Sequence, residues 1–238
     1  LLQCQYTDGR AYHLFFPLTG EGGVGDAPIK KFDWYSDDHL WLILAVNAYV
    51  KETGDFEFLD QIVLYNDKQT AGTVWEHLVR ALEFTDTWKG PHNIALAGRA
   101  DWNDTLNLDT GKGVAESVFT SMLFCRAANE MAELAEHLGR NGDVSRFRDM
   151  SRRMKDAINE TCWDGEWYVR AFDDESRPLG SKANEYGKIF INSQSWAILG
   201  DVADEERARL CLESVNKYLN TKYGIVAMYP AYTQHDHT

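Results

Sequence analysis

The sequence predicts an all-α fold built from antiparallel helix pairs, and three observations support this prediction. Apolar residues recur at helical spacing in segments of about ten to twenty residues. The intervening segments carry Gly, Pro, Asn and Asp, which end helices and form turns. No βαβ rhythm and no short tandem repeat is visible. About six helices fit half to two-thirds of a toroid of twelve, so we expect a partial (α/α)6 barrel with long loops at its site rim.

The elements follow from the start of the chain. Residues 1–38 read as irregular, with a Gly-rich loop at 20–28. Ser36 or Asp37 can cap a helix over 39–50 that Gly54 ends, and this helix is apolar almost all round, so we expect it to be deeply buried. Further helices are predicted over 73–88, 115–138, 144–159, 191–199 and 205–219, with a break at 141–143 and turns with a short hairpin over 163–188.

One helix and the cysteines can be described in more detail. The helix over 115–138 carries an apolar stripe, which comprises Val118, Met122, Cys125, Ala128, Met131 and Leu134. The chain has four cysteines and no C-x-x-C pair. We therefore expect buried free thiols in a reducing, cytoplasmic setting and no zinc or other metal site.

Composition limits the class of protein. With 238 residues, 44% hydrophobic and 26% charged, residues 1–238 suit one globular domain. The net charge of −13 argues against binding nucleic acid or an anionic membrane surface. The sequence contains no run of about 18 apolar residues, so no transmembrane helix is predicted.

The run 99–107, Arg-Ala-Asp-Trp-Asn-Asp-Thr-Leu-Asn, is the most informative stretch. It places two carboxyl groups, an indole and two amides in nine residues without helical or strand periodicity. A sugar site needs these groups: a flat apolar face for the ring, amides for hydroxyls and a carboxyl group for proton transfer. The alternative is a solvated Asx-rich loop that caps the next helix.

Several motifs occur in the order found in one enzyme family. They are Tyr6-x-Asp8-Gly9-x-Ala11-Tyr12-His13, Ser36-Asp37-Asp38-His39-Leu40-Trp41-Leu42, Asp101-Trp102-Asn103-Asp104, Gly113-Val114-Ala115-Glu116-Ser117, Phe190-x-Asn192-x-Gln194-x-Trp196-Ala197 and Tyr229-Pro230-x-Tyr232-Thr233. Together they span nearly the whole chain, which resembles the inverting disaccharide phosphorylases of glycoside hydrolase family 94. That family includes cellobiose, cellodextrin and chitobiose phosphorylases, and its catalytic domain is an (α/α)6 barrel.

The resemblance implies a reaction. Asp104 would be the general acid that protonates the glycosidic oxygen while inorganic phosphate attacks the anomeric carbon from the opposite face. The substrate would be a β-linked glucoside such as cellobiose or a cello-oligosaccharide, and the product a sugar 1-phosphate of inverted configuration. Phosphate would be a co-substrate, and no cofactor is expected.

Other residues are expected to bind the substrate. Trp102 would be the sugar platform and Asn103 a hydroxyl partner. Asp101 belongs to the same group, although an orienting or capping role is favoured for it. Asp38 would line the pocket, and helix capping is the alternative role for it. Glu185 and Lys188, in a polar loop, can hold the leaving sugar.

The resemblance also predicts what this chain lacks. In the family, an Arg- and Asp-containing segment that grips the sugar precedes the first motif, and the phosphate-binding His and Gly/Thr-rich segments follow the last. We therefore expect a catalytic-domain fragment, incomplete at both ends and inactive alone, that forms a homo-oligomer or associates with the missing domains. Two alternatives stay open: an inverting hydrolase with Asp37 or Glu185 as its base, and a non-catalytic carbohydrate-binding fragment.

Overall fold

The computed structural model describes residues 1–23, 34–106, 108 and 111–233. Asn107 and most of the predicted loop over 20–28 therefore lie outside the described residues. The described residues form six α-helices, which account for the predicted helical segments. They are α1 (Asp38–Thr53), α2 (Val74–Thr87), α3 (Val118–His137), α4 (Asn141–Thr161), α5 (Ile191–Leu199) and α6 (Glu205–Tyr218).

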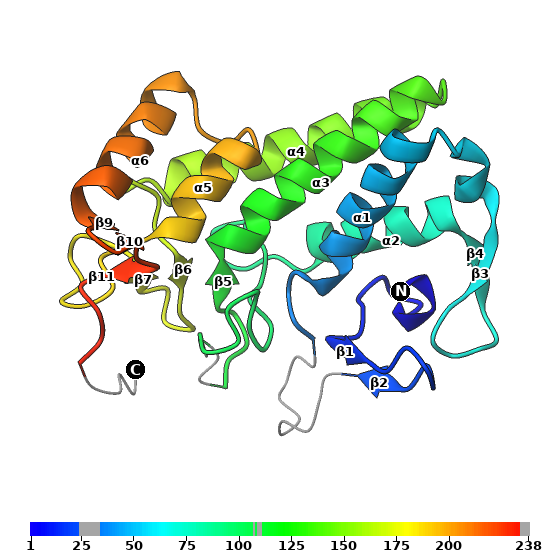
Figure 1. Ribbon diagram of the computed structural model, residues 1–238, viewed down its shortest axis with the longest axis horizontal. Coiled ribbons are helices and arrows are strands. Elements are labelled where there is room, and N and C mark those ends of the chain that lie inside the picture. The colour runs from blue at the N-terminus through cyan, green and yellow to red at the C-terminus, as the bar shows by residue number, and fades with distance from the viewer. Residues whose placement is uncertain (24–33, 107, 109–110, 234–238) are drawn as a thin grey trace.

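The helices pack as three pairs of neighbours in sequence. Helix α3 packs against α4, α1 against α2 and α5 against α6, and α3 also contacts both α1 and α5. Helices α1, α3 and α5 thus lie side by side and run in a similar direction, with their N-terminal ends on the same side of the molecule (Figure 1). The long loops gather at this side, which places the candidate site there.

The core is centred on α3. All six residues of its predicted apolar stripe are buried, from Val118 at 0% exposure to Leu134 at 6%. The cysteines are also buried and free, as the sequence predicted.

Eleven strands of two or three residues occur among the described residues, so the fold is helix-rich with small sheets. The longest sheet has the order β5-β6-β7, and β11 pairs with β8. The strands are β1 (Leu14–Phe15), β2 (Gly22–Gly23), β3 (Ile62–Leu64), β4 (Ala71–Thr73), β5 (Glu116–Ser117), β6 (Ala171–Phe172), β7 (Pro178–Leu179), β8 (Ile189–Phe190), β9 (Asn220–Thr221), β10 (Gly224–Ile225) and β11 (Met228–Tyr229). Two short 3-10 helices, Leu2–Cys4 and Phe56–Asp60, complete the elements.

Two predicted boundaries were wrong. The break predicted at 141–143 lies at Gly139, whose φ of 71° ends α3, and α4 already begins at Asn141. Asp143 falls in the first turn of α4, where the helix dipole favours an acid. Glu116, read as lying just inside a helix, belongs to β5, and Ser117 caps α3 through its side chain.

The burial predicted for the first helix was also wrong in part. Leu40 and Ile43 of α1 are fully buried, but Ala45, Ala48 and Tyr49 are exposed. The sequence could not reveal which face of α1 is exposed, because both faces carry apolar residues. In the described parts of the chain, no helix is long and apolar enough to span a bilayer.

Candidate active site

The residues of the second and third motifs are brought together by a short antiparallel pairing. Arg99 N–H donates to the Trp34 carbonyl and Ser36 N–H donates to the Ala100 carbonyl, both at 2.9 Å. Gly98, at φ 59°, leaves room for this approach, since a Cβ there would lie 2.5 Å from the Trp34 carbonyl oxygen. The pairing delivers the start of α1 and the loop after residue 100 to the same place.

Asp101 lies at the buried start of this loop and is 3% exposed. Its carboxylate pairs with Arg170 and accepts hydrogen bonds from Ser117 Oγ and from Asn103 N–H, the last at 3.0 Å. Burial acts to raise the pKa of Asp101, but the Arg170 guanidinium and these donors outweigh it and hold the pKa below its usual value. Asp101 is therefore an anion that orients the loop, which supports the orienting role over direct contact with sugar.

Arg170 is the site residue that the sequence analysis missed. Its side chain is fully buried next to β6, and it lies over the Phe119 ring at 5.7 Å. A signal was present in the sequence: Arg170 is a single cation inside the apolar run 167–172. A buried charge requires a partner, so this pattern indicates a buried acid elsewhere in the chain.

The rest of the motif is exposed. Trp102 is 66% exposed, and the Asp104 side chain is 60% exposed. Asn103 is half-buried, and its Oδ1 accepts hydrogen bonds from Thr105 Oγ1 at 2.6 Å and Thr105 N–H at 3.2 Å. The indole and the carboxyl group thus project from a local turn that Asn103 holds.

Asp38 and Asp104 both lie beside His13. His13 Nδ1 is 3.2 Å from Asp38 Oδ2, and His13 Nε2 is 3.7 Å from Asp104 Oδ2. The structure therefore brings Asp38, proposed as a substrate residue, to the proposed general acid through an imidazole.

Neither of the two side chains expected to cap α1 does so: Ser36 Oγ contacts the Ala100 carbonyl and Thr120 Oγ1, and Asp37, at the N-cap position, makes no cap hydrogen bond with its side chain. Asp37 accepts a hydrogen bond from Trp41 Nε1 at 2.7 Å instead, and is 3% exposed.

Burial raises the pKa of Asp37 to about 7, although the Trp41 hydrogen bond lowers it. Burial, together with the charges of Asp37 and Asp104, raises the pKa of Asp38 to about 8.

Glu185 and Lys188 lie on a different loop. Glu185 is exposed and Lys188 is half-buried. This loop contacts the last motif: Gly187 N–H donates to the Pro230 carbonyl at 2.8 Å, and the Lys188 carbonyl accepts from Trp167 Nε1 at 3.0 Å. The contacts of this loop thus join it to the C-terminal segment, whereas Asp104 contacts His13.

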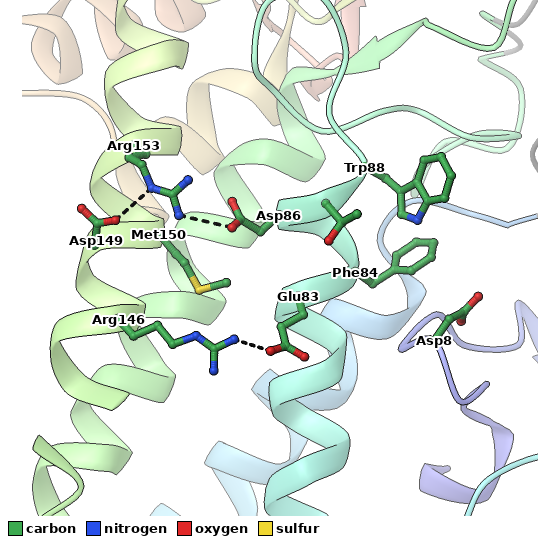
Figure 2. A pocket seen from close by; sticks show the side chains of 10 residues that line it. Asp8, Glu83, Phe84, Asp86, Trp88, Arg146, Asp149, Met150 and Arg153 are labelled. Atoms are coloured by element: carbon green, nitrogen blue, oxygen red, sulfur yellow. Dashed lines mark hydrogen bonds and ion pairs between the residues drawn. The ribbon is translucent and has the colours of Figure 1, made fainter. Parts of the chain in front are cut away.

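A cleft of about 590 Å³ lies elsewhere, between α2 and α4 (Figure 2). Two arginines cross it, and both are committed to ion pairs: Arg146 with Glu83, and Arg153 with Asp86 and Asp149. The pairs Arg146–Glu83 and Arg153–Asp86 link α4 to α2. The arginines of this cleft are thus engaged in holding α2 and α4 together, and the motif residues lie instead around the Asp104 loop.

Comparison with known proteins identifies the family. The model of the glycosyl hydrolase 94 superfamily catalytic domain matches residues 1–238. The chain is 40% identical over 237 residues to a solabiose phosphorylase of Paenibacillus borealis, covering 99% of this chain and 29% of that protein. It is 35% identical over 203 residues to an N,N'-diacetylchitobiose phosphorylase of Vibrio proteolyticus, covering 84% of this chain and 25% of that protein.

A third relative is a cellobionic acid phosphorylase of Neurospora crassa, 32% identical over 202 residues. It is covered over 25% of its length, so the chain spans between a quarter and a third of these three relatives.

Solved structures support the helical fold. A rhamnosidase from Klebsiella oxytoca superposes with a TM-score of 0.60 over 95% of this chain and 37% of its own, at 17% identity. A family 78 rhamnosidase of Bacillus sp. GL1 gives the same TM-score over 77% of this chain and 17% of its own. Because the catalytic-domain model matches this chain from end to end, the chain belongs to the glycosyl hydrolase 94 superfamily.

Proposed function

We propose that this chain carries the general acid of an inverting phosphorylase that acts on a β-linked glucoside such as cellobiose or a cello-oligosaccharide. The observation that carries the proposal is 40% identity to a disaccharide phosphorylase along 99% of the chain. The Asp101-Trp102-Asn103-Asp104 loop fits this activity, because Asp101 is held by Arg170 while Trp102 and Asp104 are exposed.

The geometry supports a division of labour within the loop. Asp104 is the general acid, and Trp102 is the platform for the sugar ring. Asp101, paired with Arg170, orients the loop, and Asp38, Asn103, Glu185 and Lys188 are proposed to assist in binding. Phosphate is the nucleophile, so the reaction requires no carboxylate base to activate water, and no cofactor is proposed.

The helix arrangement supports a barrel as the wider architecture. Helices α1, α3 and α5 form one layer and are each paired with the helix that follows, as in an (α/α)6 toroid. The exposed apolar residues Ala45, Ala48 and Tyr49 of α1 suit burial against further helices of such a toroid or a partner. Four buried free thiols suit a cytoplasmic setting.

Phosphate-dependent cleavage tests the proposal. The intact protein that contains residues 1–238 is incubated with phosphate and separately with cellobiose, cello-oligosaccharides, solabiose, N,N'-diacetylchitobiose or cellobionic acid. We expect one of these to yield a sugar 1-phosphate of inverted anomeric configuration, detected by NMR. Cleavage at equal rate without phosphate would contradict the proposal.

A hydrolase is the second candidate, since the chain is 36% identical over 101 residues to a mannosylglycerate hydrolase of Rubrobacter radiotolerans. An inverting hydrolase needs a base about 6.5–9.5 Å from the acid to activate water. Asp37 is a weak candidate because it is 3% exposed and bound to Trp41. The phosphate-free arm of the same assay distinguishes the two functions.

A further inference from the structure

His13 joins two acids that come from different parts of the chain. Asp38 begins α1, Asp104 lies in the loop between α2 and α3, and His13 precedes β1. The imidazole contacts Asp38 through Nδ1 at 3.2 Å and Asp104 through Nε2 at 3.7 Å. Each ring nitrogen therefore faces one carboxyl group.

The ring is held in this orientation. The Tyr35 ring stacks on it, with a centroid distance of 3.5 Å and an interplanar angle of 13°. The backbone N–H of His13 donates to the Gly23 carbonyl at 3.0 Å, which fixes the segment. A side chain so constrained at both its ring face and its backbone keeps its two nitrogens directed at the two acids.

The charges around the imidazole suit proton exchange. Burial, with the charges of Asp37 and Asp104, raises the pKa of Asp38 to about 8, so this carboxyl group retains a proton near neutral pH. Imidazole is the side chain best suited to pass a proton near that pH, since one nitrogen can donate while the other accepts. The group facing its second nitrogen is the proposed general acid.

We propose that His13 is a positioning residue that orients Asp104 and returns a proton to it after each turnover, with Asp38 as its proton source. The inference rests on the proposed role of Asp104 as general acid. It adds two residues, acting through Asp104, to the proton path of the reaction.

The proton balance closes. The bond between the anomeric carbon and the glycosidic oxygen breaks, the Asp104 proton moves to that oxygen, and a bond forms between the anomeric carbon and hydrogenphosphate. The Asp104 carboxylate then takes the proton from His13 Nε2, and His13 takes one at Nδ1 from the Asp38 carboxyl group. The proton of the bound hydrogenphosphate passes to water from the sugar phosphate product, and water returns one to Asp38. Water also takes the proton from His13 Nδ1 and returns one to Nε2, which restores the starting tautomer of the partly exposed ring. The Nε2 contact is longer than a hydrogen bond, and such contacts commonly tighten when substrate binds.

The test compares His13→Gln with a matched control in the intact protein. His137 is the control, because it also stacks on an aromatic ring, Phe56, at 4.3 Å, but lies at the far end of α3. Two substrates are used with phosphate: the disaccharide that the wild type cleaves best, and the dinitrophenyl glycoside of the same donor sugar, whose leaving group needs no proton.

We expect His13→Gln to lower kcat on the disaccharide by about 10- to 100-fold, below the ~10²–10⁴-fold expected for losing the proton donor itself. The basic limb of its kcat–pH profile should move to lower pH, because Asp104 then recovers its proton only from water. The dinitrophenyl glycoside should be cleaved within twofold of the wild-type rate, and His137→Gln should match the wild type on both substrates.

Asp38→Asn provides an independent check. It should reproduce the loss seen in His13→Gln, and the double variant should be no slower than either single variant, because the two residues act in one path.

Three results would overturn the inference. The first is a His13→Gln variant that keeps the wild-type kcat and pH profile on the disaccharide. The second is an equal loss of kcat on both substrates, which would indicate damage to the site. Additive effects of the two variants would indicate separate roles. If the wild type forms no sugar 1-phosphate at all, the proposed function itself fails and the relay fails with it.

Discussion

The two acids of the Asp101–Asp104 motif lie in opposite environments. Asp101 is 3% exposed, carries an ion pair to a fully buried arginine and has a lowered pKa. Asp104, three residues later, has a side chain that is 60% exposed and contacts a histidine. The same side-chain type therefore serves as a fixed anion at one end of the loop and as an accessible carboxyl group at the other.

The difference indicates how the loop is built. A general acid must reach the substrate, so its carboxyl group needs an accessible face, yet its position must be reproducible for proton transfer. The buried Asp101–Arg170 pair supplies the fixed point, and the Asn103 turn projects the exposed side chains from it. Four predictions test this division, beginning with the largest expected effect.

Replacing the exposed acid should affect catalysis most. We expect Asp104→Asn to lower kcat for phosphorolysis of an unactivated disaccharide by ~10²–10⁴-fold, because the amide keeps the shape but cannot supply a proton. Steady-state assays of sugar 1-phosphate formation measure this. The dinitrophenyl glycoside serves as the control and should lose much less activity. A wild-type rate on the disaccharide would assign the acid to another residue.

Replacing the buried cation should affect stability most. Arg170→Met leaves the Asp101 carboxylate buried without its partner, which should lower the free energy of unfolding by ~3–5 kcal/mol. Urea denaturation followed by circular dichroism measures the change. Arg209→Met is the matched control, since Arg209 pairs with Glu206 and Glu213 on the surface of α6, where such pairs contribute about 0–1 kcal/mol. An equal loss of unfolding free energy in both variants would contradict the role of the buried Asp101–Arg170 pair.

The buried Asp37 should make stability depend on pH. Its folded pKa of about 7 lies above the ~3.9 of an unfolded Asp, so the folded state binds the proton more tightly. This stabilisation is complete below pH ~4 and is lost as pH rises through 7. Asp37→Asn should therefore flatten the decline in unfolding free energy between pH 5 and 8.

Asp67→Asn is the control for this measurement. Hydrogen bonds from Thr70 and Gln69 lower the pKa of Asp67, so it titrates below this window and its replacement should leave the slope unaltered. An unchanged slope in Asp37→Asn would show that Asp37 is not the group responsible.

Removing the exposed indole should have the smallest effect. Trp102→Ala should raise KM for the disaccharide about tenfold with little change in kcat, because one ring face of apolar contact, worth roughly 1–2 kcal/mol, is lost. Isothermal titration with the substrate checks the affinity. Tyr223→Ala, at a position 87% exposed on the β9–β10 turn, should leave KM unchanged. An unchanged KM in Trp102→Ala would remove Trp102 from the sugar platform.

The sequence by itself determined the helices and the place of the motif. Apolar spacing located all six helices of the described structure, since burial of one face imposes a period on each helix. The start of α3 was predicted less well: Glu116 was placed just inside the helix, but it belongs to β5 and Ser117 caps the helix. An acid before a helix and an acid inside its first turn leave the same pattern in the sequence. The boundary after α3 was misplaced for a similar reason: Gly139, Asn141 and Asp143 all suit a helix end, and only the backbone decides which one acts.

The tertiary structure alone decided which acid is buried and what surrounds it. Asp101 and Asp104 look alike in the sequence, and they differ because Arg170, 69 residues after Asp101, reaches only the first. Likewise, His13 meets Asp38 and Asp104 only after the pairing of residues 34–36 with 98–100 joins distant segments. Periodicity reports contacts within an element, whereas the charge and exposure of a side chain depend on groups that the fold brings from elsewhere in the chain.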